Sequence, residues 1–327
     1  MTQALLELNS VSTWIEVDGS AKPILVDVSF EIGRGEIVGL VGESGSGKSM
    51  TARTIIRSLP DGGRSSGLIL LDGEDLASMP PEALRKVRAR KVGVIFQDPR
   101  SAVDPLWKIE DHLTEGMRVH SGLSRERART DAIGLLEQVG IRDGSRRLGQ
   151  YPAQLSGGLL QRVVIAGALA GAPELIIADE PTTSLDVTTQ AEIVAIFSGL
   201  RRDRGIGMLF ITHDLALAAS LCDRILVMYA GRIVDAQSRD GIFSRPGHPY
   251  TRALVGARPS AGTRGERLAV IPGLPTSASG APSGCPFHPR CAFATDVCAV
   301  QIPALLPIEG GASACLRIAD IRESLRV

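Results

Sequence analysis

Residues 36–58 read EIVGLVGESGSGKSMTARTIIRS, and this stretch decides the fold. Its first six residues form a short apolar run that predicts a strand, and the residues from Lys48 to Ser58 predict a helix that Pro60 ends. The loop between them, Gly42-Glu43-Ser44-Gly45-Ser46-Gly47-Lys48-Ser49, fits the pattern G-x-x-x-x-G-K-[ST] without a mismatch. Strand, glycine-rich loop and helix in this order predict a phosphate-binding loop.

The residue types of this loop explain how it would hold a nucleoside triphosphate. Glycines let the backbone curl so that successive N–H groups point at phosphate oxygens, and the start of the helix adds positive potential. We expect Lys48 to reach the β- and γ-phosphates, the Ser49 hydroxyl to bind Mg²⁺, and Met50 to be a further contact.

Composition and length limit the remaining possibilities. Lys and Arg total 36 and so do Asp and Glu, so the net charge is zero and nothing indicates a nucleic-acid partner. A chain of 327 residues predicts a main domain with an appended module. The start, MTQALLELNS, lacks the features of a secretory signal, and no stretch has the roughly 20 apolar residues that cross a bilayer. We therefore expect a cytoplasmic protein whose link to a membrane runs through partners.

The order of apolar runs predicts an α/β fold. Leu5–Leu8 and Ile24–Ile32 indicate an antiparallel β entry with a turn at Asp18-Gly19. Further strands are expected at 67–71, 92–96, 175–178, 208–212 and 224–229, alternating with helical patterns, which favours a mostly parallel sheet. Between residues 98 and 170 the pattern is helical, and 125–139 carries Ile133, Leu135, Leu136 and Val139 on one face. A helical insertion inside the α/β core is the prediction.

Two carboxylates follow the apolar strand 175–178. Asp179 is the expected Mg²⁺ partner, because a buried strand end would place it beside the phosphate loop. Glu180, one residue later, is the candidate general base that polarises the attacking water.

Just before this strand, the segment LSGGLLQR at 155–162 resembles the signature motif of ABC proteins. Ser156, Gly157 and Gly158 at a helix start would make a second anion site, with Gln161 one turn along. The resemblance implies that this site faces the γ-phosphate held by the opposite subunit, so that two ATP molecules lie between two cassettes in a head-to-tail dimer. The implied fold is a RecA-like phosphate-loop NTPase core.

The other ABC elements appear in order over about the first 245 residues. Gln97 resembles the Q-loop glutamine, Asp186 belongs to a segment that resembles the D-loop, and His213 resembles the switch histidine. The resemblance implies that Gln97 binds Mg²⁺ or water and that His213 supports the γ-phosphate. Trp14 is the expected aromatic that stacks on adenine, with a core or strand-surface role as the alternative.

Within the ABC class, the chain is similar to the oligopeptide/dipeptide importer ATPases. VGESGSGKS, FQDP, EPTTSLDV, HPYT at 248–251 and GCPFHPRCA at 284–292 carry this resemblance. We therefore expect a nucleotide-binding domain at 1–245, with its helical subdomain at about 98–170, and a loop-rich C-terminal extension at 246–327.

Four of the five cysteines, Cys285, Cys291, Cys298 and Cys315, fall in this extension and suggest a metal site. Four thiolates suit a [4Fe–4S] cluster and structural Zn²⁺ equally well, and the family resemblance favours iron–sulfur. Cys222 stands apart and is expected to be a buried apolar residue, and His288 is not expected to be a ligand.

The resemblance implies an ATPase that drives peptide import at the cytoplasmic face of the membrane. The expected partners are two permease subunits, a paralogous ATPase and an extracytoplasmic substrate-binding protein. Nickel or another solute is the alternative cargo. A soluble ABC ATPase acting on DNA or ribosomes is a further alternative, but the chain lacks the basic patches and long coiled-coil inserts of that class.

Overall fold

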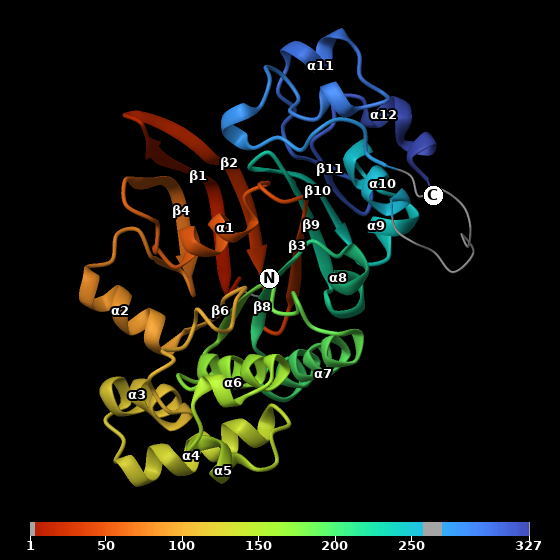
Figure 1. Cartoon of the computed structure of the whole chain (residues 1–327). Coiled ribbons are helices and arrows are strands. Elements are labelled where there is room, and N and C mark those ends of the chain that lie inside the picture. The colour runs from red at the N-terminus through yellow and green to blue at the C-terminus, as the bar shows by residue number, and fades with distance from the viewer. Residues whose placement is uncertain (1–3, 258–269, 327) are drawn as a thin grey trace. The chain divides into compact units, whose positions relative to one another are not determined.

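The computed structural model describes residues 4–257 and 270–326 (Figure 1). The chain divides into two compact units. Unit 1 comprises residues 1–6, 32–37 and 70–211, and unit 2 comprises residues 7–31, 38–69 and 212–327. Each unit is therefore built from segments that are far apart in the sequence.

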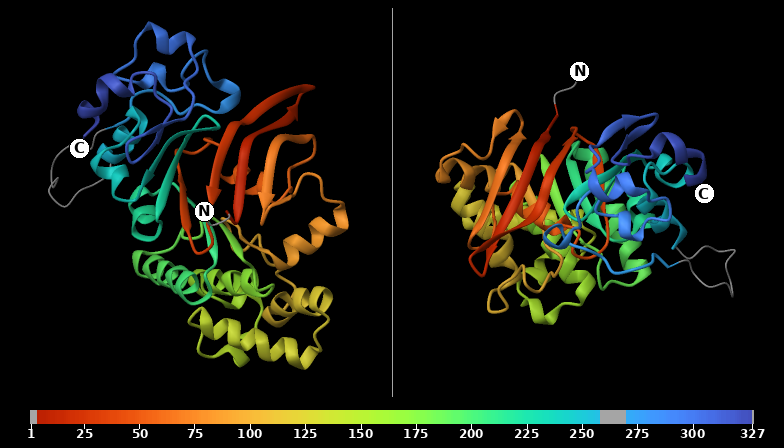
Figure 2. Two further views of the ribbon diagram at one scale, coloured as in Figure 1. Left: turned by 180° about the vertical axis from the view of Figure 1, so that it is seen from behind. Right: turned by 90° about the horizontal axis from the view of Figure 1, so that it is seen from above.

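Unit 2 contains a long β-hairpin, seen in red in both views of Figure 2. Strands β1 (Leu6–Val17) and β2 (Ser20–Ile32) are joined by Asp18 and Gly19, whose φ angles are 51° and 72°. Two consecutive residues with positive φ make the type of turn that matches the twist of paired strands, so the predicted turn is confirmed. Strand β4 (Gly63–Leu71) lies on the other side of β1.

The second set of strands in unit 2 has the order β11-β12-β10-β9-β3. Strand β3 (Ile37–Val41) is fully buried and pairs in parallel with β9 (Arg224–Tyr229), as the α/β prediction requires. Strand β10 (Arg232–Ser238) then runs antiparallel to β9. The short strands β11 (Leu306–Ile308) and β12 (Gly311–Ser313) continue the sheet from β10. The C-terminal segment therefore extends the sheet, which the loop-rich composition did not predict.

Helix α1 (Lys48–Ile55) follows β3 and ends one turn earlier than predicted. The reason is local, because Arg57 adopts a φ of 56°, which is incompatible with a right-handed helix.

Unit 1 contains the strands β6 (Val92–Ile95), β7 (Leu175–Asp179) and β8 (Gly207–Thr212). Strand β7 pairs in parallel with β6 on one side and with β8 on the other. Every residue of β7 and β8 is buried, which explains their continuous apolar sequences. The short β5 (Glu74–Asp75) pairs with the end of β4, and α2 (Pro81–Arg90) and α7 (Val187–Arg204) are the helices outside the insertion. The predicted parallel α/β core is confirmed.

The helical insertion of unit 1 consists of α3 (Ile109–Ser121), α4 (Arg125–Gln138), α5 (Gly144–Leu148) and α6 (Gly157–Leu169), coloured yellow to green in Figure 1. Leu135, Leu136 and Val139 are buried as their spacing predicted, whereas Ile133 is half-buried. Ser124 caps α4 by accepting a hydrogen bond from the Arg127 N–H.

Unit 2 also contains the short helices α8 (Leu215–Leu221), α9 (Gly241–Ser244), α10 (Pro249–Gly256), α11 (Asp296–Val300) and α12 (Ile318–Ile321). Short 3₁₀ turns lie at Pro152–Gln154 in unit 1 and at Ala278–Gly280, His288–Arg290 and Arg322–Leu325 in unit 2. Among the residues that the structure describes, none of the helices is both long and apolar enough to span a membrane.

Candidate functional site

The phosphate loop connects β3 to α1 in unit 2. Lys48 is 5% exposed, and its Nζ donates hydrogen bonds to the carbonyl oxygens of Gly42 (2.8 Å) and Glu43 (3.0 Å). The ammonium group is thus held over the loop's own backbone. Gly47 has a φ of 111°, and a Cβ at Gly42 would lie 2.3 Å from the Met228 carbonyl oxygen. The tight curl of the loop therefore requires glycine at these two positions.

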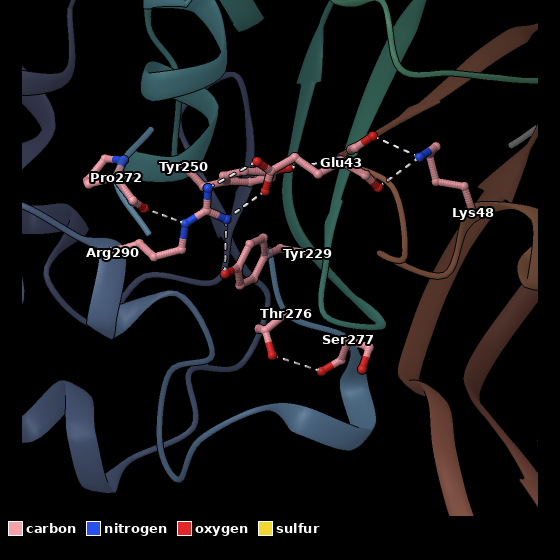
Figure 3. Close-up of polar contacts among 9 residues, drawn as sticks. Glu43, Lys48, Tyr229, Tyr250, Pro272, Thr276, Ser277 and Arg290 are labelled. Carbon is pink, nitrogen blue, oxygen red and sulfur yellow. Dashed lines mark hydrogen bonds and ion pairs between the residues drawn. The ribbon is translucent and has the colours of Figure 1, made fainter. Parts of the chain in front are cut away.

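Glu43 makes a contact that no sequence motif indicates (Figure 3). Its two carboxylate oxygens accept hydrogen bonds from the guanidinium of Arg290, at 2.7 and 3.0 Å. The carboxylate raises the pKa of Arg290, so the guanidinium remains charged. Because the partners are separated by 247 residues, no local pattern could have identified Arg290.

The catalytic carboxylates proposed from the sequence lie at the end of β7 in unit 1. Asp179 is buried, and Glu180 has a φ of 47° and donates its N–H to the Ile211 carbonyl oxygen. Glu180 Oε2 accepts hydrogen bonds from Gln97 Nε2 (3.2 Å) and from the Thr183 hydroxyl (2.8 Å). The two parallel strands β6 and β7 end side by side, which brings Gln97 and Glu180 together. Sequence reasoning missed Thr183, although it lies three residues after Glu180.

The signature segment begins helix α6, also in unit 1. Ser156 is exposed and caps the helix by accepting a hydrogen bond from the Leu159 N–H (3.4 Å). Gly157 is exposed and has open space where a Cβ would stand, so the backbone there is accessible to solvent. Gln161 is 2% exposed and lies on the buried side of α6. Ser156 and Gly157 are therefore the accessible part of this segment.

The signature segment and the predicted D-loop meet at Thr189. A Cβ at Gly158 would lie 2.8 Å from Thr189 Cγ2. Asp186 caps α7 by accepting hydrogen bonds from the N–H (3.0 Å) and hydroxyl (2.7 Å) of Thr189. The backbone hydrogen bond from Thr189 is the main cause that lowers the pKa of Asp186. Asp186 thus remains ionised while it holds the start of the helix.

Trp14 and His213 belong to unit 2, as the phosphate loop does. Trp14 is half-buried on β1. His213 follows β8 and precedes α8, whose N-terminus is capped by Asp214 through the N–H groups of Ala216 and Leu217. Of the predicted site residues, Gln97, Asp179, Glu180, the signature segment and Asp186 belong to unit 1.

The four C-terminal cysteines line one small cavity of about 20 Å³, together with His288. Burial raises the pKa of the Cys285 and Cys315 thiols to about 11, and it also raises the pKa of Cys291. His288 Nδ1 lies 2.9 Å from the carbonyl oxygen of Cys285. Within 4–257 and 270–326, however, no three Cys, His, Asp or Glu side chains are grouped as a metal site requires. The predicted iron–sulfur or zinc site is therefore not supported by this geometry.

Cys222 lies apart from these four residues and is fully buried. Burial raises the pKa of its thiol, as expected for an unreactive apolar residue.

Comparisons with known proteins agree with these motifs. The ABC transporter family matches residues 25–183, and the family described as oligopeptide/dipeptide transporter, C-terminal region, matches residues 234–298. A Brucella ovis protein named as a peptide import ATP-binding protein is 42% identical over 98% of both chains. A Sinorhizobium fredii protein named as a peptide ABC transporter ATP-binding protein is 41% identical over 97% of this chain and 96% of its own.

Among solved structures, a dimeric ATP-binding cassette in a post-hydrolysis state with bound ADP and Pi is similar, with a TM-score of 0.64. It is 28% identical and covers 72% of this chain and 98% of its own. The cassette fold and the two matched families establish that the chain belongs to the ATP-hydrolysing subunits of ABC transporters that carry the oligopeptide/dipeptide transporter C-terminal region.

Proposed function

We propose that this protein hydrolyses ATP to drive peptide import through partner permeases, at the cytoplasmic face of the membrane. The cargo is inferred from the names of the relatives that match nearly the whole chain, and from the C-terminal region that they share with it. The phosphate loop would hold the triphosphate, and Lys48 would exchange its carbonyl partners for phosphate oxygens. Trp14 would stack on the adenine.

The hydrogen bonds to Glu180 are the observation that carries the catalytic proposal. Gln97 and Thr183 both donate to Oε2, so these two hydrogen bonds fix the direction of the carboxylate that would accept a proton from water. His213 would stabilise charge on the γ-phosphate. Bound Mg²⁺, for which Ser49, Gln97 and Asp179 are the proposed ligands, would neutralise charge on the phosphates.

The accessible part of the signature segment supports a composite site. Ser156 and Gly157 present an exposed hydroxyl and exposed backbone at a helix N-terminus, where an anion is stabilised. We propose that they bind the γ-phosphate on a second ATPase subunit in a head-to-tail dimer, with Gly158, Gln161 and Asp186 supporting the segment. The second subunit would be a paralogue of this chain.

A groove on the helical insertion supports docking of a permease. It has a volume of about 1060 Å³ and is lined by residues of α3, α4 and the segments beside them. Four large side chains in it are exposed: Leu106, Trp107, Val119 and Tyr151. An exposed apolar patch with charged neighbours is typical of a protein-binding surface. Val119→Asp should abolish co-purification with the permeases and leave basal ATPase activity unchanged, whereas Val17→Asp on β1 should affect neither.

The Glu180→Gln variant tests the catalytic proposal. It should retain ATP binding and accumulate as an ATP-bound dimer, with turnover lowered by at least about 100-fold because a general base is lost. Glu82→Gln is the matched control, since Glu82 is an exposed glutamate of unit 1 that pairs with Arg85 and Lys86 of its own helix. Undiminished turnover in Glu180→Gln would remove this residue from the catalytic role.

The transport proposal is tested by purification of the intact complex. Two permeases, a paralogous ATPase and a peptide-binding protein should be recovered, and peptide should stimulate ATP turnover. Stimulation by nickel in place of peptide would show that the cargo is a metal, and recovery of ribosomes or DNA would contradict the transport role.

For the cysteines we propose a [4Fe–4S] cluster held by Cys285, Cys291, Cys298 and Cys315. The proposal rests on the chemistry of the donor set, because four free thiols line the same cavity, although their side chains are not grouped as a bound cluster would hold them. A bound cluster would draw them together and would tie together a segment with little regular structure. Protein purified without oxygen should contain iron and acid-labile sulfide. Stoichiometric zinc in their place would show that the four cysteines form a structural zinc site. Protein that contains neither the cluster nor zinc would contradict the proposal.

A further inference from the structure

Arg290 is a buried cation that the catalytic proposal does not use. It ends the 3₁₀ turn His288–Arg290, and its side chain is only 6% exposed. Nε donates to the carbonyl oxygen of Pro272 (2.8 Å), while the two terminal nitrogens bind the two oxygens of Glu43. All five N–H groups of a guanidinium lie in one plane, so such a set of contacts fixes the position of both partners.

Glu43 is held at its backbone as well as at its side chain, as Figure 3 shows. Its N–H donates to the Tyr250 hydroxyl (2.9 Å), and its carbonyl oxygen accepts a hydrogen bond from Lys48. Tyr250 is fully buried and packs against Tyr229 and Phe287, with ring centroids 4.7 and 5.3 Å away. The second residue of the phosphate loop is therefore fixed by side chains that come from the C-terminal part of the chain.

The charge of Glu43 makes this arrangement significant for the loop. A carboxylate in a loop that binds a triphosphate repels the ligand unless its charge is neutralised. The Glu43 side chain is 22% exposed, so water screens it only in part. The bidentate pair with Arg290 neutralises the carboxylate and directs it toward the C-terminal segment.

We propose that Arg290 is a positioning residue for ATP binding. Through it, the cysteine segment, residues 285–315, sets the affinity of the phosphate loop for ATP. By neutralising and anchoring Glu43, it keeps the loop open to the triphosphate. This inference rests on the proposed binding of ATP at Gly42–Ser49.

A double-mutant cycle distinguishes this role in ATP binding from a role of Arg290 in stability alone. Arg290→Gln leaves Glu43 charged and unpaired, and it should raise the Kd for MgATP roughly tenfold, with a larger effect at low salt. In the Glu43→Gln/Arg290→Gln variant the uncompensated charge is absent, so the Kd should return to within about threefold of the wild-type value. Arg290→Lys keeps the charge and should lie between wild type and Arg290→Gln.

Arg317→Gln is the matched control for damage to the C-terminal segment. Arg317 lies in the same segment, donates to the Phe293 carbonyl oxygen (3.2 Å) and pairs with Asp320 (3.4 Å). It should lower thermal stability without changing the Kd for MgATP. The inference is overturned if Arg290→Gln lowers only the Tm, or if the double variant binds ATP as weakly as the single one.

Lys48→Ala distinguishes failure of this inference from failure of the proposed site. It should abolish ATP binding in every background, because the loop then lacks its cation. If Lys48→Ala binds ATP normally, the nucleotide lies elsewhere and the proposed site is wrong. If the Lys48→Ala variant loses ATP binding while the Arg290→Gln variant keeps the wild-type Kd, the proposed site is right and only the role of Arg290 is wrong.

Discussion

The phosphate loop and the cysteine segment build their sites in opposite ways. The loop is eight consecutive residues that follow β3 and lead into α1, and its proposed ligand-binding groups are backbone N–H groups, Lys48 and Ser49. The cysteine segment gathers four side chains, from Cys285 to Cys315, around one cavity. The first site depends on local backbone conformation, whereas the second depends on packing between distant residues. A contiguous motif therefore predicts both the chemistry and the geometry of a site from the sequence. A dispersed set of side chains predicts only the chemistry.

Glycine-to-alanine substitutions should have the largest effects and test this contrast in both regions. A Cβ at Gly42 would lie 2.3 Å from the Met228 carbonyl oxygen, and a Cβ at Gly284 would lie 2.3 Å from the Cys298 carbonyl oxygen. Each clash is with backbone, so each variant should lose about 3 kcal/mol or more of stability, measured by thermal unfolding.

The two variants should differ in what else they lose. Gly42→Ala should abolish ATP binding, whereas Gly284→Ala should weaken it only as much as Arg290→Gln does. Gly45→Ala is the control for the loop, because Gly45 has a φ of 79° but open space around a Cβ, so only strain of about 1 kcal/mol is expected. Equal ATP affinities for Gly42→Ala and Gly284→Ala would contradict the proposal that the phosphate loop binds ATP directly and the cysteine segment affects it only indirectly.

The same contrast explains what the sequence could predict. The hairpin turn at Asp18-Gly19, β3, β7 and the amphipathic α4 follow from local periodicity and turn chemistry, and the structure confirms them. Strands β11 and β12 have three residues each, too few for an alternating pattern to be recognised. The contacts of Glu43 with Arg290 and of Glu180 with Thr183 are tertiary or side-chain features that a motif does not encode. Local order was therefore predictable, and the connection between the loop and the C-terminal segment was not.

Asp235 lies where the C-terminal strands join the sheet, and we expect it to make the stability of that junction depend on pH. It stands opposite Ser313 in the pairing of β10 with β12 and is fully buried. It accepts hydrogen bonds from the Gly247 N–H (2.8 Å) and from Gln237 Nε2 (2.9 Å). Burial nevertheless raises the pKa of its carboxyl group to about 6. Nearby His248 stays neutral, since burial lowers its pKa to about 3.

A carboxyl group with a raised pKa in the folded state favours folding at low pH. Between the unfolded pKa of about 4 and the folded value, the native state binds more protons, so stability decreases as the pH rises. The contribution is fully present below about pH 4 and is lost through about pH 6, a change of about 3 kcal/mol. Relative to Asp235→Asn, the wild-type Tm should therefore fall over this range. Asp240→Asn, at an exposed carboxylate, should leave the slope unchanged, and parallel pH profiles for wild type and Asp235→Asn would contradict the assignment.

Two serines that cap helices of the insertion provide the test with the smallest expected effect. It asks whether a residue in a contiguous motif has a role beyond local structure. Ser124 and Ser156 are both exposed, and each caps a helix of the insertion by accepting one backbone hydrogen bond, at 3.2 and 3.4 Å. Ser124→Ala and Ser156→Ala should therefore lose similar stability, about 1 kcal/mol each.

Their effects on turnover should separate, because a hydrogen bond to a charged phosphate is lost only in Ser156→Ala. A loss of roughly tenfold in ATP turnover is expected for that variant in the assembled complex, and none for Ser124→Ala. The isolated subunit, which has no opposite cassette, should bind ATP equally well in both variants. If Ser156→Ala turns over ATP as Ser124→Ala does, the serine is only a helix cap, and the accessible start of α6 does not complete a site on the partner subunit.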